Sequence, residues 1–419
     1  MIRGLYAAMW WVAAPLVLCR LAWRSRRQRG YLQHLGERFG SYPPAAAGPR
    51  IWIHAVSVGE TRAALPLVEE LRARHPGHRI LVTHMTPTGR ATGHEIFGDQ
   101  VERAWLPYDM AFAVRRFLAH YRPQMGIVLE TEIWPRLFEE ASRMGITVVL
   151  ANGRLSERSA RLYARAPALT RWAFSNLAGV AAQTASDAVR FREIGAAEPA
   201  ITGNVKFDLV VPDAMRELGR RLRQRFGANR TVWVAGSTRD GEEALLLDAL
   251  ARAAPPQDVL LVIVPRHPQR FDEVTRLAQA RGFDTARRSE ESQVSATTRV
   301  VIGDSMGEML AYYEAADVVV MGGSLLPFGG QNLIEPCALG RPVIVGPHTY
   351  NFSEAAEGAI GAGAARRVAD ADGALRAASA IGPAERAEMG ARASAFVAAH
   401  RGAVKRLVDW IEETAAKRR

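Results

Sequence analysis

Short apolar runs alternate with amphipathic segments along most of the chain. The apolar runs have the length of buried strands, and segments between them, such as 65–74 and 91–97, have helical spacing. The predicted strands are 51–55, 80–84, 103–106, 126–129, 148–151, 179–182, 232–235, 260–264, 300–302, 318–321 and 342–345. Strands that alternate with helices predict an α/β fold with parallel sheets covered by helices on both faces.

The alternating pattern loosens between residues 209 and 230, in a charged stretch that contains proline, and restarts at 232. A chain of 419 residues is also long for one hydrophobic core. We therefore predict two doubly wound domains, 26–211 and 212–419. They are expected to face each other, with their chemistry at the carboxyl ends of the strands.

The first 25 residues form a separate apolar segment. No charged residue occurs from Leu5 to Cys19, and an arginine-rich stretch that includes Arg24–Arg29 follows. With only Arg3 before the apolar run and no small-x-small site after it, a cleaved signal peptide is disfavoured. Residues 1–25 are predicted to be a membrane anchor with its basic end on the cytoplasmic side, as a single span or a shallow insertion. The alternative is a helix buried against the protein.

Charge and cysteine usage narrow the possible partners. Lys+Arg of 54 against Asp+Glu of 43 gives a net charge of +11, which suits nucleic acid, an anionic membrane face or a phosphorylated substrate. Nucleic acid is disfavoured because no zinc finger, aromatic RNA-binding signature or basic-region heptad occurs. Cys19 and Cys337 belong to no metal-ligand pair, which fits a reducing compartment.

One short motif is compatible with metal binding. Asp370-Ala371-Asp372 matches a pattern by which some sugar transferases hold a divalent ion. The motif stands directly before Gly373 and an alanine-rich segment with helical spacing, so we interpret it as a turn and a helix cap. No metal site is predicted.

Polar residues gather where the predicted strands end. In the first half these clusters are Ser57-Val58-Gly59-Glu60 and Glu130-Thr131-Glu132; in the second half they are Gly236-Ser237-Thr238-Arg239, Pro265-Arg266-His267-Pro268 and Gly303–Glu308. Lys206 lies close to the expected domain junction. Several such clusters at strand ends favour an active cleft over scattered surface polarity.

The loop Gly329–Pro336 is the most informative of these segments. Its two glycines allow close approach to a ligand, and a helix is expected to begin after them, with free N–H groups that attract phosphate. Glu335, about one turn into that helix, is a carboxylate able to accept hydrogen bonds from ribose hydroxyls. The loop therefore suggests a nucleotide site, and the alternative is a buried strand–turn–helix corner.

Taken together, these motifs resemble those of the Kdo (3-deoxy-D-manno-octulosonic acid) transferases of lipopolysaccharide assembly, in the same order and over nearly the whole chain. The resemblance implies a GT-B fold of two Rossmann-like domains, and a C-terminal helix able to pack back on the first. It also implies a CMP-Kdo donor, the tetra-acylated acceptor lipid IVA and action on the cytoplasmic face of the inner membrane. Neither a metal nor another cofactor is implied, and no nucleic-acid or protein partner. The motifs are Ser57–Glu60, Glu130–Pro135, Gly203–Asp208, Pro265–His267, Gly303–Met309 and Gly329–Pro336.

The resemblance also assigns roles to residues of the first domain. Glu60 is expected to be the base, held rigidly at a strand end, and partial burial would raise its pKa toward neutrality. Its alternative role is a helix-start acid that complements the macrodipole. Glu130 and Lys206 are expected to stabilise the transition state, the alternatives being an arginine pair and a solvated lysine. Glu132, two residues further on, ranks below Glu130.

The second domain is expected to bind the nucleotide, and Glu60 to face that pocket across a gap between the domains. Two other functions are weighed: a GT-B transferase or epimerase that uses a UDP-sugar, and a catalytically silent membrane scaffold. The residues expected to bind CMP are Arg266, His267, Met306, Gly307, Glu308, Asn332, Leu333, Ile334 and Glu335, with Ser237 and Arg239 as further candidates beside the phosphate.

Overall fold

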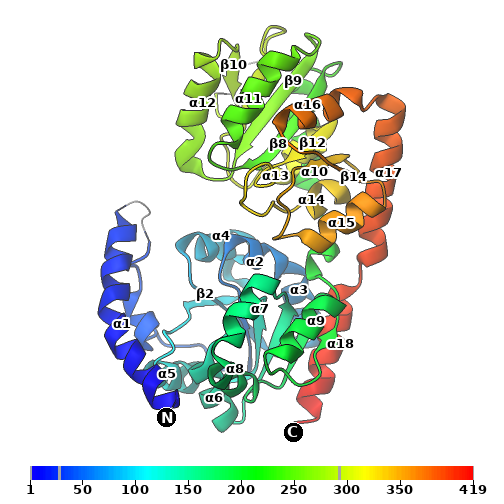
Figure 1. Ribbon diagram of the computed structural model, residues 1–419. Helices are drawn as coiled ribbons and strands as arrows, with labels where there is room; N and C mark the ends of the chain where they lie inside the picture. The colour runs from blue at the N-terminus through cyan, green and yellow to red at the C-terminus, as the bar shows by residue number, and fades with distance from the viewer. Residues whose placement is uncertain (1, 27–29, 291–293, 419) are drawn as a thin grey trace. The chain divides into compact units, whose positions relative to one another are not determined.

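Two compact units, each built on a parallel sheet of seven strands, make up the protein (Figure 1). The computed structural model describes residues 2–26, 30–290 and 294–418. Unit 1 comprises Met1–Asp208 and Gly402–Arg419, and unit 2 comprises Leu209–Arg401. The predicted α/β class with parallel sheets is confirmed.

The sheet of unit 1 has the strand order β3-β2-β1-β4-β5-β6-β7. Strands β1 and β4 are neighbours although β2 and β3 lie between them in the sequence, so the chain changes direction across the sheet at this point. Ligands of doubly wound sheets bind at such a switch point, beyond the carboxyl ends of the strands. The strands are β1 (Arg50–His54), β2 (Arg79–His84), β3 (Glu102–Trp105), β4 (Pro123–Leu129), β5 (Thr147–Gly153), β6 (Gly179–Ala182) and β7 (Ala200–Ile201).

Both faces of this sheet are apolar because side chains alternate along each strand. Trp52 packs on one face with residues of α5, α6, α8 and α9, whereas Ile51 and Ile53 pack on the other with residues of α3 and α18. The helices of unit 1 are α1 (Ile2–Ser25), α2 (Val58–Ala63), α3 (Leu65–Arg74), α4 (Pro87–Phe97), α5 (Ala111–Tyr121), α6 (Pro135–Arg143), α7 (Glu157–Ala164), α8 (Pro167–Phe174), α9 (Ala185–Glu193) and α18 (Ala403–Ala416).

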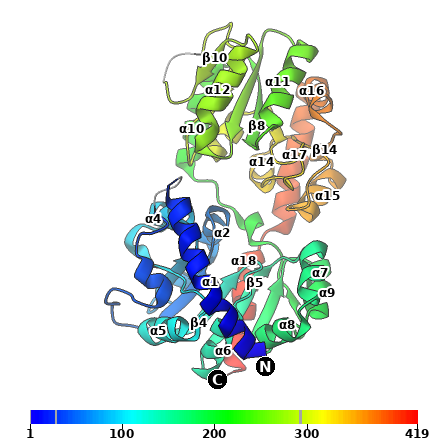
Figure 2. The same ribbon diagram turned by 60° about the vertical axis from the view of Figure 1, so that its left-hand side comes forward.

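Helix α18 comes from the C-terminal end of the chain, yet it packs against α3 and β5 of unit 1 (Figure 2). Its first turn is held by Asp208, the last residue before the chain enters unit 2. The Asp208 carboxylate accepts hydrogen bonds from the Gly402 and Val404 N–H groups, at 2.6 Å each. One carboxylate therefore joins the two places where the chain crosses between the units.

The sheet of unit 2 has the order β10-β11-β9-β8-β12-β13-β14, with its switch point between β8 and β12. Helices α11, α12 and α16 pack on one face of it, and α13, with α10 and α14, on the other. The strands are β8 (Thr231–Thr238), β9 (Val259–Pro265), β10 (Thr285–Arg287), β11 (Val300–Ile302), β12 (Val318–Met321), β13 (Val343–Val345) and β14 (Ala365–Arg367). The helices are α10 (Asp213–Phe226), α11 (Glu242–Ala253), α12 (Phe271–Ala280), α13 (Met309–Ala315), α14 (Ile334–Ala338), α15 (Ser353–Gly361), α16 (Ala371–Ala380) and α17 (Pro383–His400).

Helix α1 lies along one side of unit 1 and has two different faces (Figure 2). On the inner face, the Tyr6 hydroxyl donates to buried Asp109 at 2.7 Å, and Leu21 is buried. On the outer face, large apolar side chains such as Val12 and Leu16 are 72% and 69% exposed. Among the described residues, α1 is the one helix long and apolar enough to cross a membrane. Of the predicted arginine-rich segment, Arg27 and Arg29 lie outside the described residues.

Candidate active site

Glu60 lies at the carboxyl edge of the unit 1 sheet, in the first turn of α2. Ser57 caps this helix, and its hydroxyl donates to Glu60 Oε1 at 3.1 Å. The other carboxylate oxygen accepts the Val56 N–H at 2.5 Å. This arrangement is close to a capping box, in which a Ser and a Glu three residues later satisfy helix-start N–H groups. Glu60 therefore occupies the helix-start position of its alternative role, and the same contacts hold its carboxylate in one place.

The environment of Glu60 favours the protonated acid. Burial raises its pKa from the ordinary 4.5 to about 8, and the negative charges of Glu130 and Glu132 add to the effect. The hydrogen bonds from Val56 and Ser57 oppose it. A carboxylate with such a pKa is a much stronger base than an ordinary glutamate and can take a proton from a hydroxyl group near neutral pH.

Glu130 and Lys206 form an ion pair at the same edge, with Lys206 Nζ 2.6 Å from Glu130 Oε1. Burial acts to raise the pKa of Glu130, but the charge and hydrogen bond of Lys206, together with the charge of Arg154, hold it below the ordinary value. The Lys206 side chain is only 16% exposed, so it is not a solvated surface lysine. Glu130 is therefore the ionised acid of the cluster, and Glu60 the protonated one.

Both members of the pair stand on unusual backbone. Glu130 has a φ of 59°, in the left-handed region that a residue with a side chain seldom adopts. Lys206 lies in the short 3₁₀ helix η3 (Val205–Asp208). Asn152 Oδ1 accepts the Val205 N–H at 3.1 Å. No local sequence pattern marks Asn152, because its partner lies far along the chain.

Glu132 joins this cluster. Strand β4 ends at Leu129 and the chain turns at Glu130, so strand alternation does not decide where the Glu132 side chain points. The charge of Glu132 adds to the rise in the pKa of Glu60. Burial raises the pKa of Glu132 to about 7, with the charge of Glu130 adding to it, while a hydrogen bond from Trp134 Nε1 at 3.1 Å opposes the rise.

In unit 2, three of the predicted nucleotide residues share one buried neighbour, Tyr313. Burial raises the pKa of the Tyr313 hydroxyl, and the charge of Glu335 adds to the rise, while a hydrogen bond with Ser237 and the charge of Arg266 oppose it. Ser237 has a φ of 55° at the end of β8, next to the switch point. The fold thus brings together side chains from the ends of β8 and β9 and from α14.

His267 and Arg239 stand beside this group. Burial lowers the pKa of His267, and the charges of Arg239, Arg266 and Arg270 lower it further, so the imidazole is neutral near pH 7. The Arg239 guanidinium lies over the Phe328 ring, 4.7 Å from its centroid. A region with this much fixed positive charge is suited to phosphate.

The predicted loop 306–308 follows β11 at the same edge of the sheet. Gly307 has a φ of 82°, which explains the glycine, and the Met306 side chain is 58% exposed. Glu308 pairs with Arg288 at 3.1 Å and accepts the Ser305 hydroxyl at 2.6 Å. Because its carboxylate has these partners, Glu308 is held in place by neighbours on its own side of the sheet.

The Gly329–Pro336 loop differs in detail from the prediction. A Cβ on Gly329 would lie 2.4 Å from Asn351 and Tyr350, so this position requires glycine. Helix α14 has five residues, and Glu335 is its second, not one turn in. Asn332 Oδ1 accepts the Ile334 N–H at 3.2 Å, so one of the helix-start N–H groups expected to bind phosphate already has a partner.

The side chains of this loop also divide into two kinds. Asn332 Nδ2 donates to Glu335 Oε1 at 3.1 Å, which orients the carboxylate. Leu333 and Ile334 are buried, so they can offer a ligand only backbone groups. The loop therefore presents Asn332 and Glu335 as its polar side chains.

Glu242, which no local sequence pattern marks, supports the neighbouring loop after β12. Its fully buried carboxylate accepts the N–H groups of Arg239 at 2.8 Å and of Gly323 at 2.6 Å. It also accepts those of Leu325 at 3.0 Å and Leu326 at 3.4 Å. One carboxylate thus fixes the chain on both sides of the switch point.

The aspartate motif at 370–372 has a structural role. Asp370 caps α16 and accepts the Gly373 N–H at 2.7 Å, and Asp372 pairs with Arg252 at 2.9 Å. The interpretation of this motif as a turn and a helix cap is confirmed.

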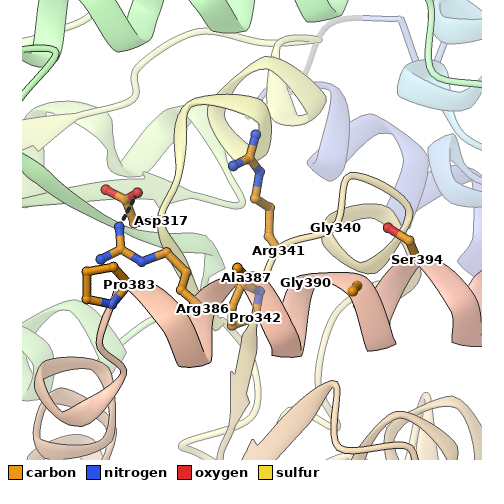
Figure 3. Close-up of a pocket in the computed structure, with 10 residues that line it drawn as sticks. Asp317, Gly340, Arg341, Pro342, Pro383, Arg386, Ala387, Gly390 and Ser394 are labelled. Carbon is orange, nitrogen blue, oxygen red and sulfur yellow. Dashed lines mark ion pairs between the residues drawn. The ribbon is translucent and has the colours of Figure 1, made fainter.

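A pocket of about 480 Å³ in unit 2 lies on the side of the sheet opposite the carboxyl ends of its strands (Figure 3). Asp317 and Pro342, which line it, directly precede β12 and β13, so the pocket is at the amino ends of the strands. Asp317 forms ion pairs with Arg386 and, at 2.7 Å, with Arg223. Since no predicted nucleotide residue lines it, we do not assign the nucleotide to this pocket.

Comparison with known proteins identifies the family. The model of the 3-deoxy-D-manno-octulosonic-acid transferases (kdotransferases) matches residues 33–209. A 3-deoxy-D-manno-octulosonic acid transferase from Bordetella pertussis is 43% identical to this chain, over 98% of the chain and 99% of its own length. The chain belongs to the Kdo transferase family. Another Kdo transferase, from Haemophilus influenzae, is 39% identical over 84% of each chain.

Solved structures resemble this Kdo transferase family member in fold. A UDP-GlcNAc 2-epimerase from Neisseria meningitidis aligns with 88% of the chain and 100% of its own length, with a TM-score of 0.60 and 15% identity. An Anabaena protein in complex with UDP-glucose aligns with 88% and 99%, with a TM-score of 0.59 and 14% identity. These similarities confirm the predicted GT-B type of fold.

Proposed function

We propose that this protein transfers Kdo from CMP-Kdo to lipid IVA and releases CMP, with inversion at the anomeric carbon and without a metal ion. The observation that carries the proposal is the acid cluster of unit 1 in a member of the Kdo transferase family. There a glutamate with a strongly raised pKa, Glu60, stands in the electrostatic field of the Glu130–Lys206 pair.

In the proposed reaction, a sugar hydroxyl of the acceptor attacks the anomeric carbon of Kdo. Glu60 takes the hydroxyl proton as the new C–O bond forms, and the bond between the anomeric carbon and the phosphate oxygen breaks. The electron pair leaves with CMP. Attack on the face opposite the leaving group inverts the anomeric carbon.

Glu130 and Lys206 act on the charges that develop during this step. The ionised Glu130 opposes positive charge at the anomeric carbon, and Lys206 attracts the carboxylate of Kdo or the departing phosphate. Because the two side chains are already paired, they need little rearrangement when the charge develops.

The residues of unit 2 are proposed to hold the cytidine phosphate. Arg266 and Arg239 supply fixed positive charge to the phosphate, which supports transfer without a divalent ion. Asn332 and Glu335 are proposed to accept hydrogen bonds from ribose, and the backbone of Met306–Glu308 to contact the base. Transfer requires these residues and the acids of unit 1 to act on the same donor, and this stays a prediction.

We further propose that α1 inserts shallowly into the cytoplasmic leaflet of the inner membrane. Its outer face is apolar, whereas its inner face carries the Tyr6–Asp109 hydrogen bond and an ion pair between Arg3 and Glu139 at 3.1 Å. A full span would carry these polar contacts into the hydrocarbon, where such groups are costly. A helix with one apolar face outward suits an interfacial position.

Product mass tests the function. Incubation of the purified protein with CMP-Kdo and lipid IVA is expected to give lipid IVA plus one or more Kdo residues, with CMP released. The fold alone would also suit a UDP-sugar enzyme, so UDP-sugars are offered in parallel. Release of UDP with no use of CMP-Kdo would overturn the proposal. A silent scaffold would bind CMP and give no product from either donor.

A further inference from the structure

Two polar atoms beside the acid cluster have no protein partner in the described part of the chain: Glu132 Oε1 and the Tyr163 hydroxyl. Trp134 Nε1 donates to Glu132 Oε2, which fixes the carboxyl group and leaves its second oxygen unpaired. Tyr163 belongs to α7, on a different segment of unit 1. Both side chains are half-buried, so a ligand can reach them.

Trp134, which holds Glu132, packs against the same apolar core of unit 1 as Tyr163, and Glu132 lies two residues after Glu130. Burial raises the pKa of Tyr163, and the charge of Glu132 raises it further, which places the phenol near this carboxyl group. The charge of Glu132 also acts on Glu60, and that of Glu130 acts on Glu132. Glu132 and Tyr163 therefore belong to the same corner of unit 1 as the proposed catalytic acids.

Trp134 gives this corner an apolar wall and a fixed shape. Its ring packs against the core of unit 1 and meets the His54 ring edge-on, with centroids 6.2 Å apart. Because the indole is held by packing, the hydrogen bond that it donates also holds Glu132. Small-molecule sites usually consist of an apolar wall with a small number of precisely placed polar groups.

We propose that Glu132 and Tyr163 bind hydroxyl groups of the transferred Kdo and so select this sugar. The inference rests on the proposed function, in which Glu130 acts at the anomeric carbon of Kdo, two residues from Glu132. The pyranose form of Kdo keeps hydroxyls at C4, C5, C7 and C8, whereas the tetra-acylated acceptor has acyl groups on many of its positions. A site built to pair with hydroxyls strongly rejects analogues that lack them, because its own polar groups then stay unpaired.

The test compares Tyr163→Phe and Glu132→Ala with the wild-type protein in steady-state transfer and in CMP titration. Loss of the Tyr163 hydroxyl is expected to lower kcat/KM for CMP-Kdo roughly 3- to 10-fold, the effect of one neutral hydrogen bond. Loss of the Glu132 carboxyl group is expected to lower it roughly 10- to 100-fold when both proteins are compared at about pH 9, where Glu60 is mostly ionised with or without the charge of Glu132. CMP affinity and the KM for lipid IVA should not change, because neither group contacts them.

A matched control separates binding from folding. The Tyr42 hydroxyl donates to the Trp105 carbonyl at 3.2 Å, so Tyr42→Phe is expected to lower the melting temperature and leave kcat/KM unchanged. Tyr163→Phe should do the reverse, since its hydroxyl has no protein partner to lose. CMP-Kdo analogues that lack single hydroxyls add a second readout. For one of these analogues, transfer by the wild-type protein should be slow, and transfer by the variants should be no slower, because the hydrogen bond is already missing.

Three results would overturn the inference. The first is an unchanged kcat/KM for CMP-Kdo in both variants. The second is a rise in the KM for lipid IVA alone, which would assign the two groups to the acceptor. The third is a loss of transfer activity that parallels the fall in melting temperature, which would indicate a folding defect. Failure of the wild type to use CMP-Kdo at all would instead refute the proposed function, so the two failures can be told apart.

Discussion

Transfer activity is expected to fall about tenfold for each pH unit below about 8, because the proposed base is then protonated. Burial and the charges of Glu130 and Glu132 raise the pKa of Glu60 from 4.5 to about 8. Only the carboxylate can take the acceptor's proton. A group with that pKa is ionised in about one molecule in ten at pH 7, and in about one in a hundred at pH 6.

The assay is kcat/KM for CMP-Kdo between about pH 6 and 9 at saturating acceptor, which reports the ionisation of the enzyme before CMP-Kdo binds. Ser57→Ala provides the perturbation. The Ser57 hydroxyl donates to Glu60 and opposes the rise in its pKa, so its removal should move the acid limb to higher pH. The same change removes the cap of α2 and should cost about 1 kcal/mol of unfolding free energy.

Melting temperatures recorded across the same pH range serve as the control for unfolding. A profile that stays flat from about pH 6 to 8 would refute the reasoning, since an ordinary glutamate is fully ionised there. An acid limb that moves to lower pH in Ser57→Ala would refute the role given to the hydroxyl.

Three further predictions concern the Glu130–Lys206 ion pair, the Glu242 carboxylate that holds the loop after β12, and the exposed apolar face of α1. Lys206→Met should lower the free energy of unfolding by about 2–3 kcal/mol in urea, because Glu130 keeps a buried charge without its lysine. Adding Glu130→Gln to Lys206→Met should restore part of that free energy of unfolding but should not restore transfer. If the double variant regained no stability, the Glu130–Lys206 ion pair would be contradicted. Glu242→Ala should lower both the melting temperature and CMP affinity, because four backbone N–H groups lose their acceptor; unchanged CMP titration would contradict this. Val12→Gln with Leu16→Gln should reduce co-sedimentation with anionic vesicles and leave transfer to detergent-dispersed lipid IVA unchanged, and undiminished sedimentation would refute the outward membrane face.

The buried strands could be predicted from the sequence because each is a continuous apolar run. The strands that the pattern missed, β7, β10 and β14, all lie at the edges of their sheets. Edge strands are short and partly exposed, so they need no apolar run; β14, for example, is Ala365–Arg367 and contains two arginines. Hydrophobic patterning therefore identified the sheet centres, where most candidate residues emerge, and only one of the four edge strands, β3.

Within the site, residues that belong to a local sequence motif could be predicted, whereas residues that stabilise segments distant in sequence could not. Ser57 and Glu60 stand at the spacing of a capping box, a pattern visible in the sequence. The place of Glu132 could not be predicted from strand alternation, because β4 ends at Leu129 and the backbone at Glu130 is no longer extended. Asn152 and Glu242 act on segments distant in sequence, so only the fold could reveal them.

The most direct test of the account is transfer by Glu60→Gln, measured together with its CMP affinity. The amide keeps the size of the side chain but cannot take a proton. The account predicts that CMP binding is retained while product formation from CMP-Kdo and lipid IVA falls by about 10²- to 10⁴-fold, the usual contribution of a general base. Product formation by Glu60→Gln at the wild-type rate would contradict it.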